Sequence, residues 1–157
     1  MSPVKAIPAG FHTITPSLTC KDAAAAIELY KKIFGAEELM RMKTPDGGKI
    51  THAELKIGDS MIFVNDELGP QTASAPGASK VSLFLYVEDA DTTFNRAVEA
   101  GSTVAMALEN QFWGDRFGSI TDPFGHSWGI ATHVEDLTPE EIGRRAAAFF
   151  AKAAGKS

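Results

Sequence analysis

Hydrophobic and polar positions in the first part of the chain follow two different periods. Ile27, Tyr30 and Phe34 recur at the spacing that places them on one helical face, and Asp22 precedes them as a helix cap, which predicts a helix over 23–34. Alternating or β-branched patterns typical of strands lie around it at about 13–19, 38–42, 50–57 and 60–65. The predicted order is therefore one strand, one helix and three strands.

The same order recurs in the second part of the chain, after an aperiodic linker rich in Gly, Pro, Ala and Ser. The predicted elements are a strand at 81–87, a helix that follows Asp89, and strands at about 103–108, 116–121 and 126–133. When Asp22 is placed over Asp89, an offset of 67 residues, the other elements fall close to register. This regularity indicates an internal duplication.

A third helix is predicted after the duplicated region, at about 138–154. Thr138 is a suitable N-cap, Pro139 suits the first helical position, and Glu141 completes a capping box. An apolar face then follows, from Ile142 to Phe150. We expect this face to pack on the same chain or on a second subunit rather than on a membrane surface.

Composition and charge narrow the classes of function. The chain has 157 residues, of which 44% are hydrophobic and 22% charged, as in ordinary globular proteins. Its net charge of −5 and the lack of a basic run argue against nucleic acid or an anionic membrane as a partner. Neither a membrane-spanning run nor a signal peptide is visible, and the lone Cys20 suits a reducing compartment, so a cytoplasmic location is expected.

Four short motifs stand within the duplicated pattern. They are YKKIFGAE at 30–37, HAEL at 52–55, IGDS at 57–60 and DPFGH at 122–126. Together with the two β-α-β-β-β modules, these motifs resemble the vicinal oxygen chelate superfamily, and more closely its glyoxalase/bleomycin-resistance and PhnB-like branch. The resemblance covers about residues 12–135.

The resemblance implies an α+β fold in which two tandem βαβββ modules form a curved, cup-like mixed sheet, followed by a C-terminal helix. Residues 1–157 would form a single domain, with module one at about 12–65, the linker at 66–80, module two at about 81–135 and the helix at about 138–154. A small-molecule ligand and a second copy of the chain are the implied partners. The superfamily includes lyases, isomerases, dioxygenases, thiol transferases and drug-sequestering proteins, so the fold alone does not select an activity.

In the metal enzymes of this family, one ligand stands on the first strand and one on the fourth strand of each module. Carried over, these positions fall on Thr15, Phe63, Ser82 and Gly129. None of them supplies the imidazole or carboxylate that a divalent ion requires, and a shift of one residue does not help. No metal and no other cofactor is therefore expected at these positions.

The hairpin at Gly58-Asp59 predicts which polar groups face the cup. A two-residue loop places Glu54 opposite Phe63, so that His52 and Glu54 share the face of Phe63. These two side chains are candidate catalytic residues, because a His and a carboxylate two positions apart could transfer protons or hold an ion. The alternative is that they are simply the wetter face of an alternating strand.

The second hairpin is predicted to turn at Pro123-Phe124. This register places Gly129 opposite Gly118 and puts Arg116 on the cup face, whereas a different loop length would reverse the assignment. Arg116 could instead form an ion pair with Asp115. Trp113 is expected near the rim, and the histidines of this region, including His133, are expected to be structural or surface residues.

These positions favour a protein that binds a small, partly aromatic or amphipathic molecule, since apolar walls with few polar groups are typical of ligand pockets. The predicted ligand-binding residues are Thr15, Ser17, Phe63, Ser82, Phe84, Trp113, Arg116 and Gly129, with Tyr86 as a further part of the wall. The alternative is a metal-dependent lyase, isomerase or dioxygenase in which His52 and Glu54 bind a divalent metal ion. A third possibility is a collapsed cup that serves only as an interaction partner.

Overall fold

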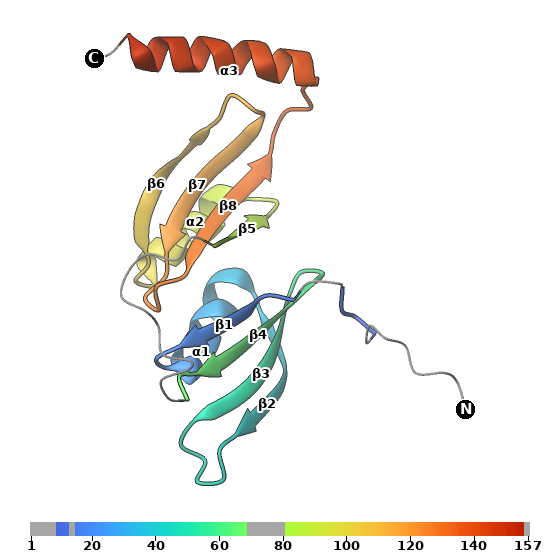
Figure 1. The fold of residues 1–157 in the computed structure, drawn as a ribbon, viewed down its shortest axis with the longest axis vertical. Coiled ribbons are helices and arrows are strands. Elements are labelled where there is room, and N and C mark those ends of the chain that lie inside the picture. The colour runs from blue at the N-terminus through green and yellow to red at the C-terminus, as the bar shows by residue number, and fades with distance from the viewer. Residues whose placement is uncertain (1–8, 13–14, 69–80, 156–157) are drawn as a thin grey trace. The chain divides into compact units, whose positions relative to one another are not determined.

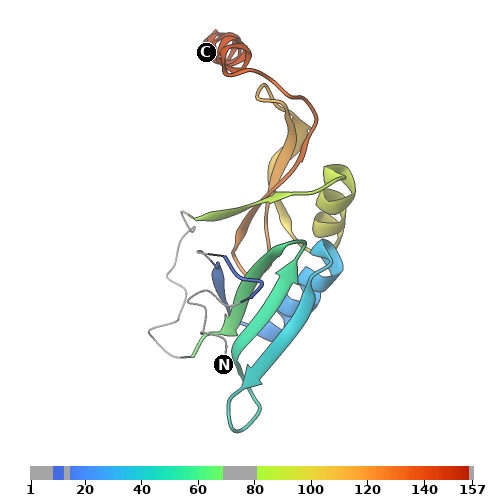
Figure 2. The ribbon, with the colours of Figure 1, turned by 90° about the vertical axis from the view of Figure 1, so that its right-hand side faces the viewer.

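The computed structural model describes residues 9–12, 15–68 and 81–155, and the chain divides into two compact units, Met1–Ala78 and Ser79–Ser157. Each unit contains a four-stranded mixed sheet with a helix on one face, and the second unit also carries a C-terminal helix (Figure 1, Figure 2). The α+β fold class predicted from the sequence is confirmed.

The first unit follows the predicted order of elements. These are β1 (Ser17–Cys20), α1 (Ala23–Phe34), β2 (Glu37–Lys43), β3 (Ile50–Ile57) and β4 (Ser60–Asp66). The strands lie in the order β1-β4-β3-β2, and β1 runs parallel to β4. Asp22 caps α1 by accepting the N–H of Ala25, and Gly35 ends the helix with a left-handed φ of 66°.

A buried carboxylate fastens the elements of the first unit together. Asp66, the last residue of β4, is only 8% exposed. One of its oxygens accepts the N–H of Ala23 at 2.8 Å, and the other accepts the N–H of Ile50 at 2.7 Å. The side chain therefore joins the end of β4 to the starts of α1 and β3, whereas the sequence had suggested that the linker begins at this residue.

The second unit repeats this topology. It consists of β5 (Ser82–Tyr86), α2 (Ala90–Glu99), β6 (Thr103–Asn110), β7 (Asp115–Thr121), β8 (Ser127–His133) and α3 (Pro139–Ala154). The sheet order is β5-β8-β7-β6, with β5 parallel to β8, and Asp89 caps α2 as Asp22 caps α1. The two matching topologies agree with the predicted duplication.

The predicted register of the β7–β8 hairpin was wrong by one residue. Thr121 pairs with Ser127, so five residues rather than two separate the paired ends of the strands. The carboxylate of Asp122 stabilises this longer loop by accepting the N–H groups of Phe124 and His126, both at 2.9 Å. The change of loop length reverses the face on which every residue of β7 lies relative to β8.

The C-terminal helix contacts its own unit through an aromatic cluster. It begins as predicted with Thr138, whose hydroxyl accepts a backbone N–H of the first turn. The ring of Phe112 lies 5.3 Å from that of Phe149 and 6.0 Å from that of Phe150. Among the residues that the structure describes, no helix is both long and apolar enough to cross a membrane.

Candidate functional site

Four aromatic side chains form a continuous surface on the second unit, and we call them the aromatic wall: Phe84, Tyr86, Trp113 and Phe117. Phe84 stacks on Phe117 with ring centroids 5.2 Å apart and an interplanar angle of 12°. Tyr86 lies 4.9 Å from Phe84, and Trp113 lies 5.9 Å from Phe117. The wall lies on the side of the sheet away from α2, because the neighbours of Phe117 in β7 face α2, as Gly118 does against Phe94.

The wall can form because Gly129 of β8 carries no side chain beneath the rings of Phe84 and Phe117. Gly129 pairs with Phe84 on one side and with Ser119 on the other. A Cβ at this position would lie 2.8 Å from Cε2 of Phe117 and 3.3 Å from Cδ2 of Phe84. Both distances are shorter than ordinary carbon contacts, so the two rings occupy the space that a side chain at 129 would need.

A buried carboxylate holds the edge of the wall. Asp115 is 2% exposed, and one of its oxygens accepts hydrogen bonds from the hydroxyl of Tyr86 and from Nε1 of Trp113, both at 3.0 Å. The other oxygen lies 2.8 Å from Nδ1 of His133. One carboxylate thereby holds three side chains from three parts of the unit. These hydrogen bonds also compensate for the burial of the carboxylate.

The ionisation of this cluster follows from its contacts. Nε2 of His133 lies 2.8 Å from Asp136, so each ring nitrogen faces a carboxylate. The hydrogen bonds to Asp115 and then to Asp136 raise the pKa of His133 above 6.5, and this favours the imidazolium, which donates from both nitrogens. The same Asp115 raises the pKa of Tyr86, which remains a neutral donor.

The predicted polar pair of the first unit comes together as expected. Glu54 is opposite Phe63, confirming the predicted register of the β3–β4 hairpin. Nε2 of His52 lies 3.3 Å from Oε1 of Glu54, and the His52 ring lies 4.7 Å from that of Phe63. The ring of Phe11 lies 5.8 Å from Phe63, so the pair has an apolar flank.

The other predicted residues of the ligand site divide into two groups. Ser17 lies beside Phe63 in the first unit, and Thr15 precedes it as a half-buried residue. Ser82 lies in β5, two residues before Phe84 and on the same face of the strand. Ser17 and Ser82 therefore share the strand faces of Phe63 and Phe84, respectively. Their role in binding a ligand remains a prediction, as does that of Thr15.

Arg116 does not lie on the surface that was predicted for it. It pairs with Thr132 rather than Ala131, and therefore faces α2. Its guanidinium forms a two-pronged ion pair with Asp91, at 2.7 and 2.8 Å, and also donates to Asn110. The alternative ion pair with Asp115 is wrong as well, since that carboxylate binds the side chains of the wall.

The family's metal positions do not fit a metal centre in this chain. At Gly129, the rings of Phe84 and Phe117 fill the space that a ligating side chain would take. Phe63, at the corresponding position of the first unit, has no donor atom. Within the described ranges, no three His, Cys, Asp or Glu side chains gather closely enough to hold a metal ion. The absence of a metal cofactor remains a prediction, based on the chemistry of these residues.

Sequence reasoning missed Asp115 and Phe117 as site residues and assigned His133 no role in the site. The alternation of side chains along a strand could have identified them. Asp115 and Phe117 lie on the same face of β7 as Ser119, which pairs with Gly129. That signal required the correct loop length in the hairpin. The contacts of Asp115 could not be found from local pattern, because Tyr86 is 29 residues away in sequence.

Comparisons with known proteins agree with this architecture. The family model described as "Glyoxalase/Bleomycin resistance protein/Dioxygenase superfamily" matches residues 10–130. The Mycobacterium tuberculosis protein Rv0887c is 43% identical over 136 residues, which cover 82% of this chain and 79% of that protein. The crystal structure of TioX from Micromonospora sp. ML1 has a TM-score of 0.58 at 27% identity, covering 77% of this chain and 99% of TioX.

A PhnB protein from Bacillus cereus has a similar fold. Its structure superimposes with a TM-score of 0.65 at 20% identity, covering 77% of this chain and 99% of that protein. At this identity the similarity concerns the fold.

Proposed function

Because the chain belongs to the Glyoxalase/Bleomycin resistance protein/Dioxygenase superfamily, we propose that it is a small-molecule-binding protein that holds a planar aromatic ligand on the aromatic wall, without the metal centre of the family's metal enzymes. The observation that carries this proposal is the replacement of a metal-ligand position by Gly129 with two stacked rings over it. A site built in this way offers π-surface and shape in place of Lewis acidity.

The exposure of the wall supports a role in binding. Phe84 is 51% exposed and Tyr86 is 62% exposed, although both are large and apolar. Such exposed apolar surface is typical of binding sites. Asp115 fixes Tyr86 and Trp113 in place, so that a ligand would meet a surface that is already ordered, which reduces the entropic cost of binding.

The proposal is tested with a library of planar aromatic compounds, glycopeptide antibiotics included, screened by thermal shift and tryptophan fluorescence on chelator-treated protein. Phe84→Ala should weaken binding of a hit about tenfold or more, because aromatic anchors dominate such contacts. Phe150→Ala is the matched control, since Phe150 is 62% exposed but lies in α3. Equal affinities of the two variants, or the absence of any hit, would contradict the proposal.

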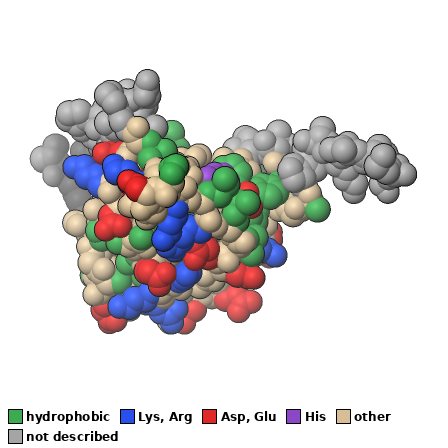
Figure 3. Space-filling view, turned by 90° about the horizontal axis from the view of Figure 1, so that it is seen from below, with side chains coloured by type: hydrophobic (Ala, Val, Ile, Leu, Met, Phe, Trp, Pro, Cys, Tyr) green, Lys and Arg blue, Asp and Glu red, His purple; other side chains and the backbone are tan. Residues whose placement is uncertain are grey.

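We also propose that the chain functions as a homodimer. Hydrophobic side chains reach the surface among the charged ones (Figure 3). The exposed large hydrophobic residues of β2 and β6, each an edge strand of its sheet, are Leu39, Met40 and Met42 of β2, and Val104 and Met106 of β6. Sedimentation equilibrium should give twice the 16.8 kDa mass of the chain. A monomer at every concentration would refute this part of the proposal.

A metal-dependent reaction at His52 and Glu54 is the second candidate. It is favoured by the 3.3 Å contact between the two side chains and by their partial burial beside Phe63. Metal analysis of tag-free protein grown with iron, manganese, nickel and zinc tests this reading directly. Near-stoichiometric metal that is lost in both His52→Ala and Glu54→Gln would favour it, whereas unchanged metal content in these variants would exclude it.

A further inference from the structure

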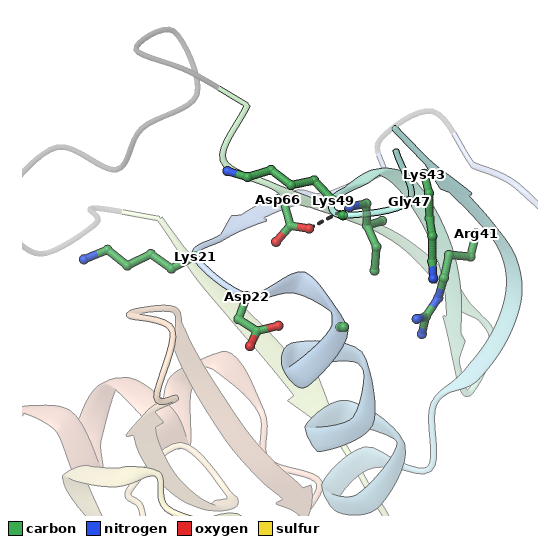
Figure 4. A pocket seen from close by; sticks show the side chains of 10 residues that line it. Lys21, Asp22, Arg41, Lys43, Gly47, Lys49 and Asp66 are labelled. Carbon is green, nitrogen blue, oxygen red and sulfur yellow. Dashed lines mark hydrogen bonds between the residues drawn. The ribbon is translucent and has the colours of Figure 1, made fainter. Parts of the chain in front are cut away.

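A cavity of about 380 Å³ lies in the first unit. It is bordered by the start of α1, the β2–β3 hairpin and the end of β4 (Figure 4). Arg41, which lines the cavity, pairs with the buried Ala53, whereas its neighbours Met40 and Met42 pair with Glu54 and His52. Successive residues of a strand point to opposite faces, so the cavity and the His52–Glu54 pair lie on opposite sides of the sheet.

Cationic side chains dominate the lining of this cavity. They are Lys21, Arg41, Lys43 and Lys49. In Figure 4, Arg41 and Lys43 both turn toward α1, whereas the head groups of Lys21 and Lys49 extend away from these two. This concentration of positive charge contrasts with the net charge of −5 of the whole chain.

The two carboxylates of the lining already have other partners. Asp66 accepts one backbone N–H with each oxygen, and Asp22 accepts the N–H of Ala25 as the helix cap. No ion pair joins either of them to the four cations within the described part of the chain. The two carboxylates therefore lower the positive electrostatic potential of the cavity but form no ion pair with its ammonium and guanidinium groups.

The lysines of the lining are not neutralised by other ion pairs either. Arg41 binds Glu38 at 2.6 Å, but Lys21, Lys43 and Lys49 form no salt bridge with a described residue. Lys49 donates only to the backbone carbonyl of Glu67, at 2.8 Å. The head groups of Arg41 and Lys43 turn to the same side, and an anion bound between them would relieve the repulsion of these two like charges.

We propose that this cavity binds a phosphate group, either as inorganic phosphate or as part of a phosphorylated small molecule. A phosphate presents several acceptor oxygens to ammonium and guanidinium donors and carries the double charge that this lining favours. The volume exceeds that of phosphate alone and falls in the range of small-molecule sites, so there is room for an ester group. The site is independent of the aromatic wall and does not depend on the function proposed for it.

The test is a titration of ¹⁵N-labelled full-length protein with inorganic phosphate and, separately, with phenyl phosphate, at an ionic strength held constant with sodium chloride. Gly47 and Gly48 line the cavity, so their amide resonances report on it. We expect saturable shifts of these resonances. Tighter binding of phenyl phosphate would identify a phosphorylated molecule as the ligand, and tighter binding of inorganic phosphate would identify the free ion.

Two variants with the same change of charge make the result specific. Lys43→Gln should weaken phosphate binding about tenfold, the effect of losing one charge-assisted hydrogen bond. Lys56→Gln removes an exposed lysine of β3 on the other face of the sheet and should leave affinity unchanged. Equal affinities of the two variants, or shifts that sodium chloride reproduces, would overturn the proposal.

Discussion

Gly129→Ala tests the packing on which the candidate site depends. The new methyl group would lie 2.8 Å from Cε2 of Phe117 and 3.3 Å from Cδ2 of Phe84. Carbon atoms prefer separations of about 3.5–4.0 Å, so the Phe117 ring must move by more than about half an ångström. Overpacking of this kind costs about 1–3 kcal/mol, and the lower entropy of the unfolded alanine chain offsets about 0.4–1 kcal/mol of that cost.

The expected net loss is therefore about 1–2 kcal/mol in the free energy of unfolding, or about 2–8 °C in Tm for a chain of this size. Urea unfolding followed by circular dichroism measures it. Gly143→Ala is the matched control, because nothing lies within 4 Å of that position in α3 and alanine there should stabilise the helix by about 0.5–1 kcal/mol. Adding Phe117→Leu to Gly129→Ala should recover part of the loss, since the smaller side chain no longer meets the methyl group.

Two results would refute this reasoning. If Gly129→Ala were as stable as the parent protein, the rings would not be packed against β8 in the way described. If Phe117→Leu and Gly129→Ala were strictly additive, the loss would arise elsewhere, because contacting residues are expected to show a coupling energy of about 0.5 kcal/mol or more.

Three further predictions follow from the same structure. Asp66→Asn should lower the free energy of unfolding by about 1–3 kcal/mol in urea titrations, because the single amide oxygen cannot replace both carboxylate oxygens as acceptors of the two backbone N–H groups. An unchanged free energy of unfolding would contradict the role of Asp66 in joining β4 to α1 and β3. Gly114→Ala should cost more than Gly129→Ala in the same assay, since its φ is 99° and a Cβ would lie 2.6 Å from a backbone carbonyl oxygen, and the reverse order would count against this account. The raised pKa of His133 should add stability that is fully present below about pH 6.5 and is lost as the pH rises through the pKa of the folded protein. Urea unfolding midpoints measured against pH should therefore lose this part of their pH dependence in His133→Gln. If the variant and the parent gave the same pH profile, the ion pairs of His133 would not be its source.

The order of elements could be predicted because its signals are local. Asp22 and Asp89 each accept a backbone N–H three residues ahead, and helical caps of this kind are readable from a few adjacent residues. The Gly58-Asp59 loop is equally local, and the register that it predicted for Glu54 and Phe63 is the observed one. Resemblance to the family then supplied the arrangement of the elements into sheets.

The remainder depended on interactions that are distant in sequence or on an exact loop length. Asp122 accepts two backbone N–H groups of its own loop and thereby selects five residues where two were predicted, which moved Arg116 to the other face. Asp115 gains its role only when Tyr86 and His133 are brought to it by the sheet. Neither partner is marked by a local pattern.

The most direct test of the central claim is an NMR titration of chelator-treated protein with the best aromatic hit, in which the two tryptophan indole N–H resonances are followed. Nε1 of Trp113 lies at the wall on Asp115, whereas Nε1 of Trp128 is buried on Asp122 and serves as an internal control. We expect a saturable shift of the Trp113 resonance with little change at Trp128, without added metal. Binding that leaves Trp113 unchanged, or that appears only when a divalent metal is restored, would contradict this expectation.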